Sequence, residues 1–365
     1  MIMFRYFARK FLWTFLMIAT VFLVVLVLID MVEQIQKFGN ASASFGDVVG
    51  LTLLNAPRSL YGILPLIVLL ATVALFLNLA RTSELIAARA AGRSALRMLL
   101  APVSVALGLG VLAVLMLNPL VAATSKRYET QASRFVHGAD SVLSVSTEGL
   151  WLRQGGAQGQ TVIRAAGSNQ DATRLVDVSF YSFDRVGAPS QRIEASEAVL
   201  EKGAWRLRDA KVWPLAESAN PERDARRVKS LLVPSDLMRD QIRDSFGAPS
   251  AIPIWDLPAF ISSLDRAGFS ARAHRVWFQS ELAKPLLFVA MVLLAAAFTM
   301  RHARFSHTGV MVLAAVLTGF GLFFVRNFTQ IMGENGQIPI ALAAWAPPVA
   351  AILLALALLL HLEDG

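Results

Sequence analysis

The sequence has no cysteine and few charged residues. Charged side chains make up 16% of its 365 residues and hydrophobic side chains 55%, whereas a soluble domain carries roughly 25% charged residues. Without cysteine the chain can form no disulfide, no thiolate nucleophile and no thiolate metal site. The composition therefore indicates a membrane protein.

The sequence also lacks the short motifs of common catalytic sites. It has no G-x-x-x-x-G-K-[ST] phosphate loop, no H-E-x-x-H or C-x-x-C motif and no G-x-S-x-G nucleophile elbow. Its five histidines are scattered, and His302 and His307 are better explained as surface residues than as a metal or base pair. We expect no catalytic residue, no bound metal and no cofactor.

Six apolar runs are each long enough to cross a bilayer as a helix of about 20 residues. They lie at 11–29, between Arg58 and Arg81, from Arg97 to Val121, at 276–300, at 308–325 and at 338–360. The first run is too long for a signal peptide and lacks a cleavage site, so we expect it to be retained. The sequence predicts an α-helical membrane protein with six transmembrane helices.

Positive charges predict the orientation of these helices, because lysine and arginine concentrate in short cytoplasmic loops. Basic residues precede the first run, separate the second from the third, and separate the fourth from the fifth: Arg5, Arg9, Lys10, Arg81, Arg89, Arg93, Arg97, Arg301 and Arg304. These segments share one side, so we expect both termini in the cytoplasm and residues 122–275 outside it. The net charge of +8 could reflect nucleic acid, anionic lipid or topology alone, and we expect no nucleic-acid partner.

The polar segment between the third and fourth runs has the sequence pattern of an all-β domain. Residues 173–184 alternate, 193–213 resemble two strands joined at 201–203, and 146–155 and 159–167 are further strand candidates bounded by glycine. The charged segment 220–230 reads as a loop, and 257–278 returns to helical spacing. We therefore divide the chain into membrane helices at 1–121, an inserted all-β domain at 122–275, and membrane helices at 276–365.

The stretch RTSELIAARAAGRSALR, residues 81–97, predicts a short helix between the second and third runs. Arg89, Arg93 and Arg97 share one face, and Glu84 lies in the first turn after a possible cap at Thr82 or Ser83. The arginines alone would suit an anchor on anionic lipid. A carboxylate and a small apolar face of Leu85, Ala88 and Gly92 favour a docking helix for another protein instead.

Several cations lie on the extracytoplasmic side, where they are usually rare. Lys37, Arg58, Lys126, Arg127 and Arg134 could form a basic rim for a phosphorylated or carboxylated amphiphile, or could reach individually to lipid headgroups. Asp30 and Glu33 could pair with this rim.

Arg326 lies inside or at the end of the fifth apolar run, which makes it a functional candidate unless it pairs with Glu334 at the membrane boundary. Glu281 and Lys284, three residues apart before Pro285, predict a local ion pair at the mouth of the fourth span. Pro65, Pro102 and Pro119 are expected to kink or end their helices.

Together these pieces resemble one family, the lipopolysaccharide-export permeases LptF and LptG. Three spans, a large β domain and three more spans are the order found in that family. The matching pieces are RYFARKFLWTF, IDMVEQIQKFG, RTSELIAARAAGRS, STEGLWLRQG, WRLRDA and LPAFISSLDRAGFSARAHRVWFQSELAKPL. IDMVEQIQKF and the C-terminal half resemble the LptG branch more than the LptF branch.

The resemblance implies an ABC-transporter permease that moves lipopolysaccharide out of the inner membrane of a Gram-negative bacterium toward a periplasmic bridge. The implied partners are an LptF-like permease, an LptB-like ATPase dimer, an LptC-like single-span protein and lipopolysaccharide itself. The β domain would be a periplasmic jelly-roll. ATP would be hydrolysed by the partner, so the chain itself would not be an enzyme.

The resemblance also implies roles for particular residues. The helix at about 82–95 would be the coupling helix that enters a groove in the ATPase, with contacts from Glu84, Leu85, Arg89 and Gly92. Lipid A phosphates would meet Lys37, Arg58, Arg134 and Arg326. The chain departs from some relatives at Asp30 and Gln36, where they are basic, and Arg326 could compensate.

Two other classes remain open. A lipoprotein-releasing type of ABC permease also has a periplasmic domain, but four spans are expected there. A lipid-modifying membrane enzyme would need a convergent acid, base or metal cluster, which the sequence does not offer.

Overall fold

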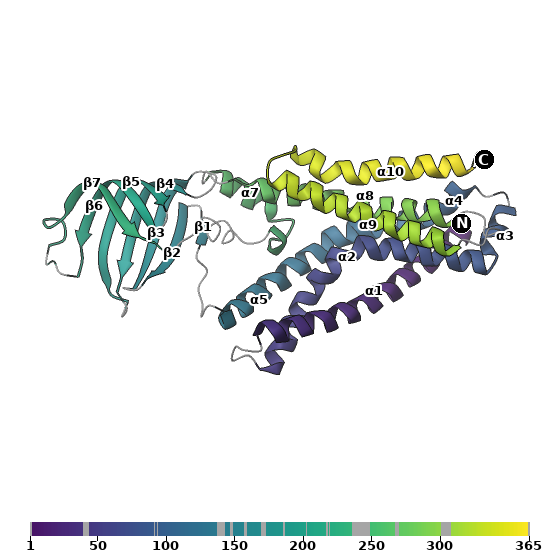
Figure 1. Cartoon of the computed structure of the whole chain (residues 1–365), viewed down its shortest axis with the longest axis horizontal. Helices are drawn as coiled ribbons and strands as arrows, with labels where there is room; N and C mark the ends of the chain where they lie inside the picture. The colour runs from purple at the N-terminus through teal and green to yellow at the C-terminus, as the bar shows by residue number, and fades with distance from the viewer. Residues whose placement is uncertain are drawn as a thin grey trace. The chain divides into compact units, whose positions relative to one another are not determined.

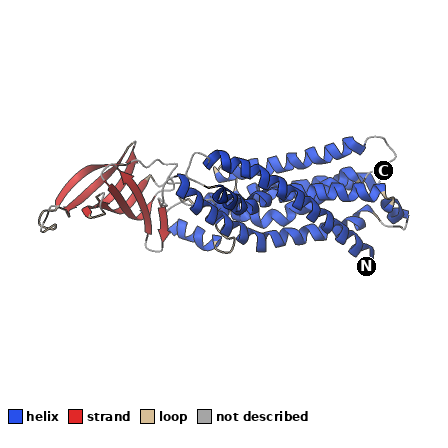
Figure 2. Ribbon diagram, turned by 90° about the horizontal axis from the view of Figure 1, so that it is seen from below, coloured by secondary structure: helices blue, strands red, loops and turns tan. Residues whose placement is uncertain are grey.

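In the computed structural model the chain forms two compact units, which we describe separately. The first comprises residues 1–136, 250–255 and 272–365, and the second residues 137–249 and 256–271. The structure describes all residues except 1, 39–43, 91, 93, 137–142, 147–148, 157–158, 169–172, 185–186, 202, 217, 219, 236–248, 267–269, 301–307 and 364–365. Helices build the first unit, and the strands belong to the second (Figure 2).

The first unit confirms the six predicted membrane helices, since six helices of its described part are long and apolar enough to span a bilayer. They are α1 (Ile2–Phe38), α2 (Phe45–Arg81), α4 with α5 (Ala95–Leu112 and Asn118–Val136), α8 (Arg272–Thr299), α9 (Thr308–Glu334) and α10 (Ile340–Glu363). A π-helical turn, η1 (Ala113–Leu117), joins α4 to α5, and the short α3 (Glu84–Ala90) follows α2. Both chain termini lie at the end of the unit that carries α3 (Figure 1).

The first unit has two ends. The α3 end carries α3. The insertion end, opposite to it, is where the chain leaves α5 at Val136 and re-enters α8 at Arg272.

Caps and prolines explain where these helices begin and bend. The hydroxyl of Ser44 accepts a hydrogen bond from the backbone N–H of Asp47, and the Asp47 carboxylate accepts one from the Ser44 N–H, which is a capping box at the start of α2. Pro119 lacks the N–H that would donate to Leu115, four residues earlier, and the helix widens into η1 just before it.

The core of the first unit forms around α2 and α8. In their most apolar stretches 67% of α2 and 72% of α8 is buried, against 11% of α1 and 17% of α9. Two glycines permit close helix contact: a Cβ on Gly110 would lie 2.5 Å from Pro285 Cα, and one on Gly319 would lie 2.4 Å from a methyl carbon of Leu69. Both contacts join a helix before the β insertion to a helix after it.

The described residues of the second unit form one antiparallel sheet of seven strands in sequence order, with helix α7 (Leu257–Arg266) packed against it. The strands are β1 (Leu143–Ser146), β2 (Gly149–Gly156), β3 (Gly159–Ser168), β4 (Arg174–Phe183), β5 (Pro189–Glu201), β6 (Ala204–Pro214) and β7 (Arg226–Pro234). A short 3-10 turn, η2 (Pro249–Ala251), lies where the chain passes from the second unit to the first. Trp205 and Phe180 form the centre of the core, where their rings pack edge to face with their centres 6.4 Å apart.

The strands predicted at 146–155, 159–167, 173–184 and 193–213 are confirmed as β2 to β6. The loop predicted for 220–230 is wrong in its second half, because β7 begins at Arg226. Strand β7 is an edge strand whose first five residues are all exposed, so charged side chains replace the alternation by which a half-buried strand is recognised. Strand β1 was not predicted.

A polar contact holds the turn before β7 against the sheet. The carboxylate of Glu222 accepts hydrogen bonds from the ammonium of Lys211 and from the indole N–H of Trp213. These two donors lower the pKa of Glu222 below its usual value, because they stabilise the ionised form.

Candidate functional site

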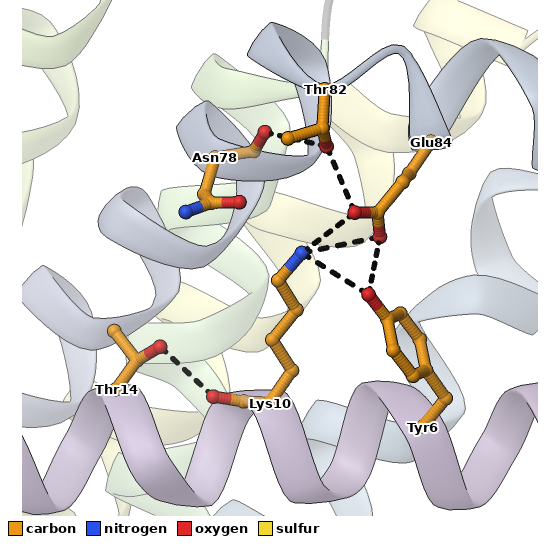
Figure 3. Close-up of polar contacts among 6 residues, drawn as sticks. All are labelled: Tyr6, Lys10, Thr14, Asn78, Thr82 and Glu84. Atoms are coloured by element: carbon orange, nitrogen blue, oxygen red, sulfur yellow. Dashed lines mark hydrogen bonds and ion pairs between the residues drawn. The ribbon is translucent and has the colours of Figure 1, made fainter.

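A polar cluster joins the coupling-helix candidate α3 to the first membrane helix (Figure 3). The ammonium of Lys10 lies 2.9 Å and 3.1 Å from the two carboxylate oxygens of Glu84, and the hydroxyl of Tyr6 donates to the same carboxylate at 2.9 Å. The hydroxyl of Thr82 lies 3.0 Å from it as well. Glu84, predicted as a first-turn residue, is therefore a contact between α3, α1 and the end of α2.

Two effects oppose each other on the pKa of Glu84. Partial burial raises it, whereas hydrogen bonds from Lys10, Tyr6 and Thr82, together with the charge of Lys10, lower it. The net result is a pKa below the usual value for glutamate. The carboxylate is consequently ionised at neutral pH, and its contacts are charge-assisted hydrogen bonds.

The backbone before α3 turns sharply to present Glu84 to α1. Ser83 has a φ of 60°, the left-handed conformation that non-glycine residues adopt rarely. Its carbonyl accepts from the N–H of Ala87 at 3.0 Å and so begins α3. Thr82 ends α2, with its N–H bonded to the carbonyl of Asn78 at 3.0 Å. The first turn of α3 is thus defined by these local bonds and by the contact with α1.

The faces of α3 differ from the prediction. We expected Leu85, Ala88 and Gly92 to offer a small apolar face to a partner, but Leu85 and Ala88 are buried against the bundle itself. Leu85 belongs to the same core cluster as Phe7 of α1. Ile86, which was not among the predicted contact residues, is 63% exposed and is the large apolar side chain of α3 that remains accessible.

The arginines of this segment are described only in part. The side chain of Arg89 and the whole of Arg93 lie outside the described residues, while Arg97 is exposed near the start of α4. Gly92 is exposed and has a φ of 75°, so it makes the left-handed turn between α3 and α4.

The cations proposed to meet lipid phosphates lie on four different helices. Lys37 is exposed in the last turn of α1 and has its ammonium 5.5 Å from the centre of the Phe38 ring. Arg58 is exposed on α2, and Arg326 is half-buried on α9. Arg134 lies on α5, with a side chain outside the described part. The hydrogen bonds and ion pairs of the described residues do not join these cations to one another.

The predicted partners of the rim also differ. Asp30 is buried and accepts hydrogen bonds from the amides of Asn55 at 2.7 Å and Gln34 at 3.3 Å, rather than pairing with a cation. Arg326 donates to the side chain of Asn327 at 3.1 Å, and the carboxylate of Glu334 accepts from Gln330 at 2.9 Å. The pairing of Arg326 with Glu334 is thus not among the described ion pairs.

Comparison with known proteins decides the family. The sequence profile of the lipopolysaccharide export system permeases LptF/LptG matches residues 5–361. The chain belongs to this family. It is 25% identical over 358 residues to the lipopolysaccharide export system permease protein LptG of Escherichia coli K12, covering 96% of this chain and 93% of the relative. The LptG protein of Haemophilus influenzae is 24% identical over 315 residues, covering 85% of this chain and 84% of the relative.

These findings establish a multi-pass membrane protein of a permease family, and the named relatives agree with the LptG-like pieces of the sequence. They leave the roles of individual residues to be argued from geometry. Tyr6 and Lys10 were not predicted as partners of Glu84, although they lie four residues apart and so share a helical face. That spacing was the available signal, but nothing in the sequence said which distant residue the face would meet.

Proposed function

We propose that this chain is a permease subunit of an ABC exporter that removes lipopolysaccharide from the inner membrane and passes it to a periplasmic bridge. ATP is hydrolysed by a separate LptB-like ATPase dimer. An LptF-like permease completes the membrane cavity, and an LptC-like single-span protein accompanies the pair. The family and the names of the relatives support the cargo.

The observation that carries the proposed coupling is the way α3 is fastened to the bundle. Glu84 bonds to α1, Leu85 is buried in the core, and a tight turn at Thr82 joins α3 directly to α2. The exposed side chain of Ile86 remains for a partner. A helix held in this way passes a displacement by the ATPase to α1 and α2 together instead of absorbing it.

The proposed orientation places the α3 end in the cytoplasm, with both termini, and the second unit in the periplasm. Exposed Arg81 and Arg97 flank α3, in agreement with the enrichment of basic residues on the cytoplasmic side. The ATPase would then meet α3 from the cytoplasm.

The proposal that the four predicted cations bind lipid phosphates is supported by their positions along the membrane helices. Arg58 precedes Arg81 by 23 residues of one helix, or about 35 Å, and the hydrocarbon core is about 30 Å thick. Arg326 follows Thr308, the first residue of α9, by about 27 Å. With the α3 end at the cytoplasmic boundary, Arg58 lies beyond the hydrocarbon core and Arg326 lies close to its outer boundary, and Lys37 and Arg134 lie near the ends of their helices. Guanidinium and ammonium groups are suited to the phosphates of an outer-leaflet lipid.

The docking proposal is tested by purifying the full chain with its native partners. Ile86→Asp should prevent co-elution of an ATPase, because it places a charge in an apolar contact, while Ile86→Leu should retain it. Glu84→Ala should assemble but release less lipopolysaccharide per ATP hydrolysed. If the Ile86→Asp complex assembles normally and the Glu84→Ala complex exports normally, α3 does not couple ATP hydrolysis to transport.

The cargo proposal is tested by charge reversal. Lys37→Glu combined with Arg58→Glu should reduce lipopolysaccharide co-purifying with the complex several-fold. Arg5→Glu with Arg9→Glu is the matched control, since it changes the charge equally at exposed positions near the other end of α1. Equal lipid content in both variants would reduce Lys37 and Arg58 to anchors at the membrane boundary.

A further inference from the structure

A second polar cluster lies inside the membrane unit, centred on Glu281 of α8. Glu281, Lys284, Tyr61 and Asn118 are each at most 5% exposed, so the ion pair predicted at the mouth of the fourth span is in fact buried within the bundle. Moving charges out of water into a membrane protein is costly, and such groups are usually retained for a function. The cluster shares no residue with the proposed docking and lipid-phosphate sites, although the charge of Arg326 on α9 acts electrostatically on Glu281, Lys284 and Tyr61.

Among the described residues, three side chains donate hydrogen bonds to the Glu281 carboxylate. The ammonium of Lys284, one turn along α8, donates to one oxygen at 2.7 Å. The other oxygen accepts from the hydroxyl of Tyr61 on α2 and from the amide of Asn118 on α5, the latter at 3.2 Å. The Asn118 carbonyl oxygen accepts from the backbone N–H of Ile254 at 2.9 Å. One carboxylate therefore joins α2, α5 and α8, and through Asn118 it also holds the segment 250–255.

Each of these helices is weakened by proline at the level of the cluster. Pro65 and Pro285 lack the N–H groups that would bond to the carbonyls of Tyr61 and Glu281, four residues earlier. The π-helical turn η1 ends immediately before Asn118 and Pro119. Prolines and π-helical turns are the usual sites of helix bending. Three possible bending points thus meet at the residues that bind one carboxylate.

Toward the insertion end, helices on each side of the cluster are tied into their own group. Before the β insertion, Asp30 of α1 accepts from Asn55 of α2, and Gln34 of α1 contacts Tyr128 of α5 at 3.0 Å. We call α1, α2 and α5 with these contacts the first group.

After the insertion, Arg272 of α8 donates to the carbonyls of Gly333 and Ile338, both at 2.7 Å, and Trp345 of α10 donates to Gln279 of α8 at 2.9 Å. We call α8, α9 and α10 the second group. In Figure 1 the ribbons of α1 and α5 diverge from those of the second group toward the insertion end. Toward the α3 end, by contrast, the groups meet at close contacts such as Leu69 with Gly319.

We propose that the Glu281 cluster is a latch between the two groups, placed where their helices can bend. When Tyr61 and Asn118 leave the carboxylate, the insertion ends of the first group swing about Pro65 and η1, while the packed α3 end stays closed. Lys284 remains with Glu281 in this state, so the buried carboxylate keeps a counter-ion. The use of this opening to admit or expel a lipid rests on the proposed function, but the latch itself does not.

The absence of cysteine makes a direct distance measurement possible. Spin labels at Phe45 on α2 and Leu342 on α10, both exposed apolar positions, report the separation of the two groups in the full-length protein in nanodiscs. Phe45 lies 16 residues from Tyr61, or about 24 Å, so a bend of about 20° moves it by about 8 Å.

The double variant Tyr61→Phe with Asn118→Leu should add a population displaced by up to about 8 Å. Tyr61→Phe alone retains the aromatic ring, whose centre lies 3.4 Å from the Lys284 ammonium, and should give a smaller fraction of the same population. Thr72→Val is the control, because Thr72 is buried on α2 but bonds its own helix at Val68, 2.8 Å away, and its distances should match the unmodified protein.

Adding Pro65→Ala to the double variant should suppress the displaced population, since it restores the bond to Tyr61. Distances identical to the unmodified protein in the double variant would overturn the latch. A displaced population that persists with Pro65→Ala would overturn the bending point. The readout needs neither ATP nor transport, so it fails or succeeds independently of the proposed function.

Discussion

The contact between Lys10 and Glu84 should be measurable as a coupling free energy in the stability of the full-length protein. Lys10→Met and Glu84→Gln each remove one charge while preserving most of the side-chain volume. The double variant removes both. If the ion pair forms as the geometry indicates, the double variant should lose less stability than the sum of the single variants.

The size of the coupling follows from distance and exposure. Lys10 lies 2.9 Å from one carboxylate oxygen, and the two side chains are 22% and 31% exposed. Exposed ion pairs contribute about 0.2–1 kcal/mol and hydrogen bonds to charged groups about 1.5–3 kcal/mol. Solvent screening at this exposure favours the lower range, so we expect about 1 kcal/mol, or roughly a fivefold change in the unfolding equilibrium.

Helical circular dichroism during denaturant unfolding in mixed micelles would provide the four free energies. Arg9→Met is the matched control, because Arg9 is an exposed cation adjacent to Lys10 on the same helix, and its cycle with Glu84→Gln should be additive. High salt should weaken the coupling. It should be fully present above the ordinary glutamate pKa of about 4.3 and be lost as pH falls through the lowered pKa of Glu84. Additive single variants at neutral pH and low salt would refute the contact.

Three further variants test the packing and the second unit. Gly110→Ala should destabilise the membrane unit by about 1–3 kcal/mol in the same unfolding assay, whereas Gly108→Ala, which meets open space, should be neutral or stabilising. Leu85→Ala should lower stability by about 2–3 kcal/mol, because its buried side chain leaves a cavity, while Ile86→Ala should have little effect on unfolding. Glu222→Gln should destabilise the second unit at neutral pH, and the difference should vanish in acid as the lowered pKa of Glu222 is crossed.

Much of the fold could be predicted because burial dominates it. Apolar runs of membrane length became the six long helices, and alternation in 173–184 and 193–213 became β4 to β6. The edge strand β7 was missed because exposed charges carry no periodic signal. The hydrophobic pattern predicts which residues are buried. It does not predict an exposed edge strand, which is held by backbone hydrogen bonds to one neighbouring strand.

The candidate site was predictable only in its local part. Glu84 could be assigned to the first turn of a short helix, because capping and charge near a helix start are local properties. Its ion pair with Lys10 spans 74 residues of sequence, and the burial of Leu85 depends on α1 lying beside α3. Contacts of this kind depend on tertiary packing, which no spacing within either segment specifies.

Helix α2 connects the two polar clusters. Thr82, at one end, contacts Glu84 beside the proposed ATPase surface, and Tyr61 bonds to Glu281 about 31 Å away along the same helix. Between them α2 is largely buried, and its apolar packing resists deformation. Hydrogen bonds and ion pairs can exchange partners as a subunit moves, whereas a close-packed core moves as a body. Helix α2 is largely buried between the two clusters and has polar contacts at both ends of this stretch that can change partners. It is therefore suited to carry a displacement from α3 to the helices that the Glu281 cluster holds together.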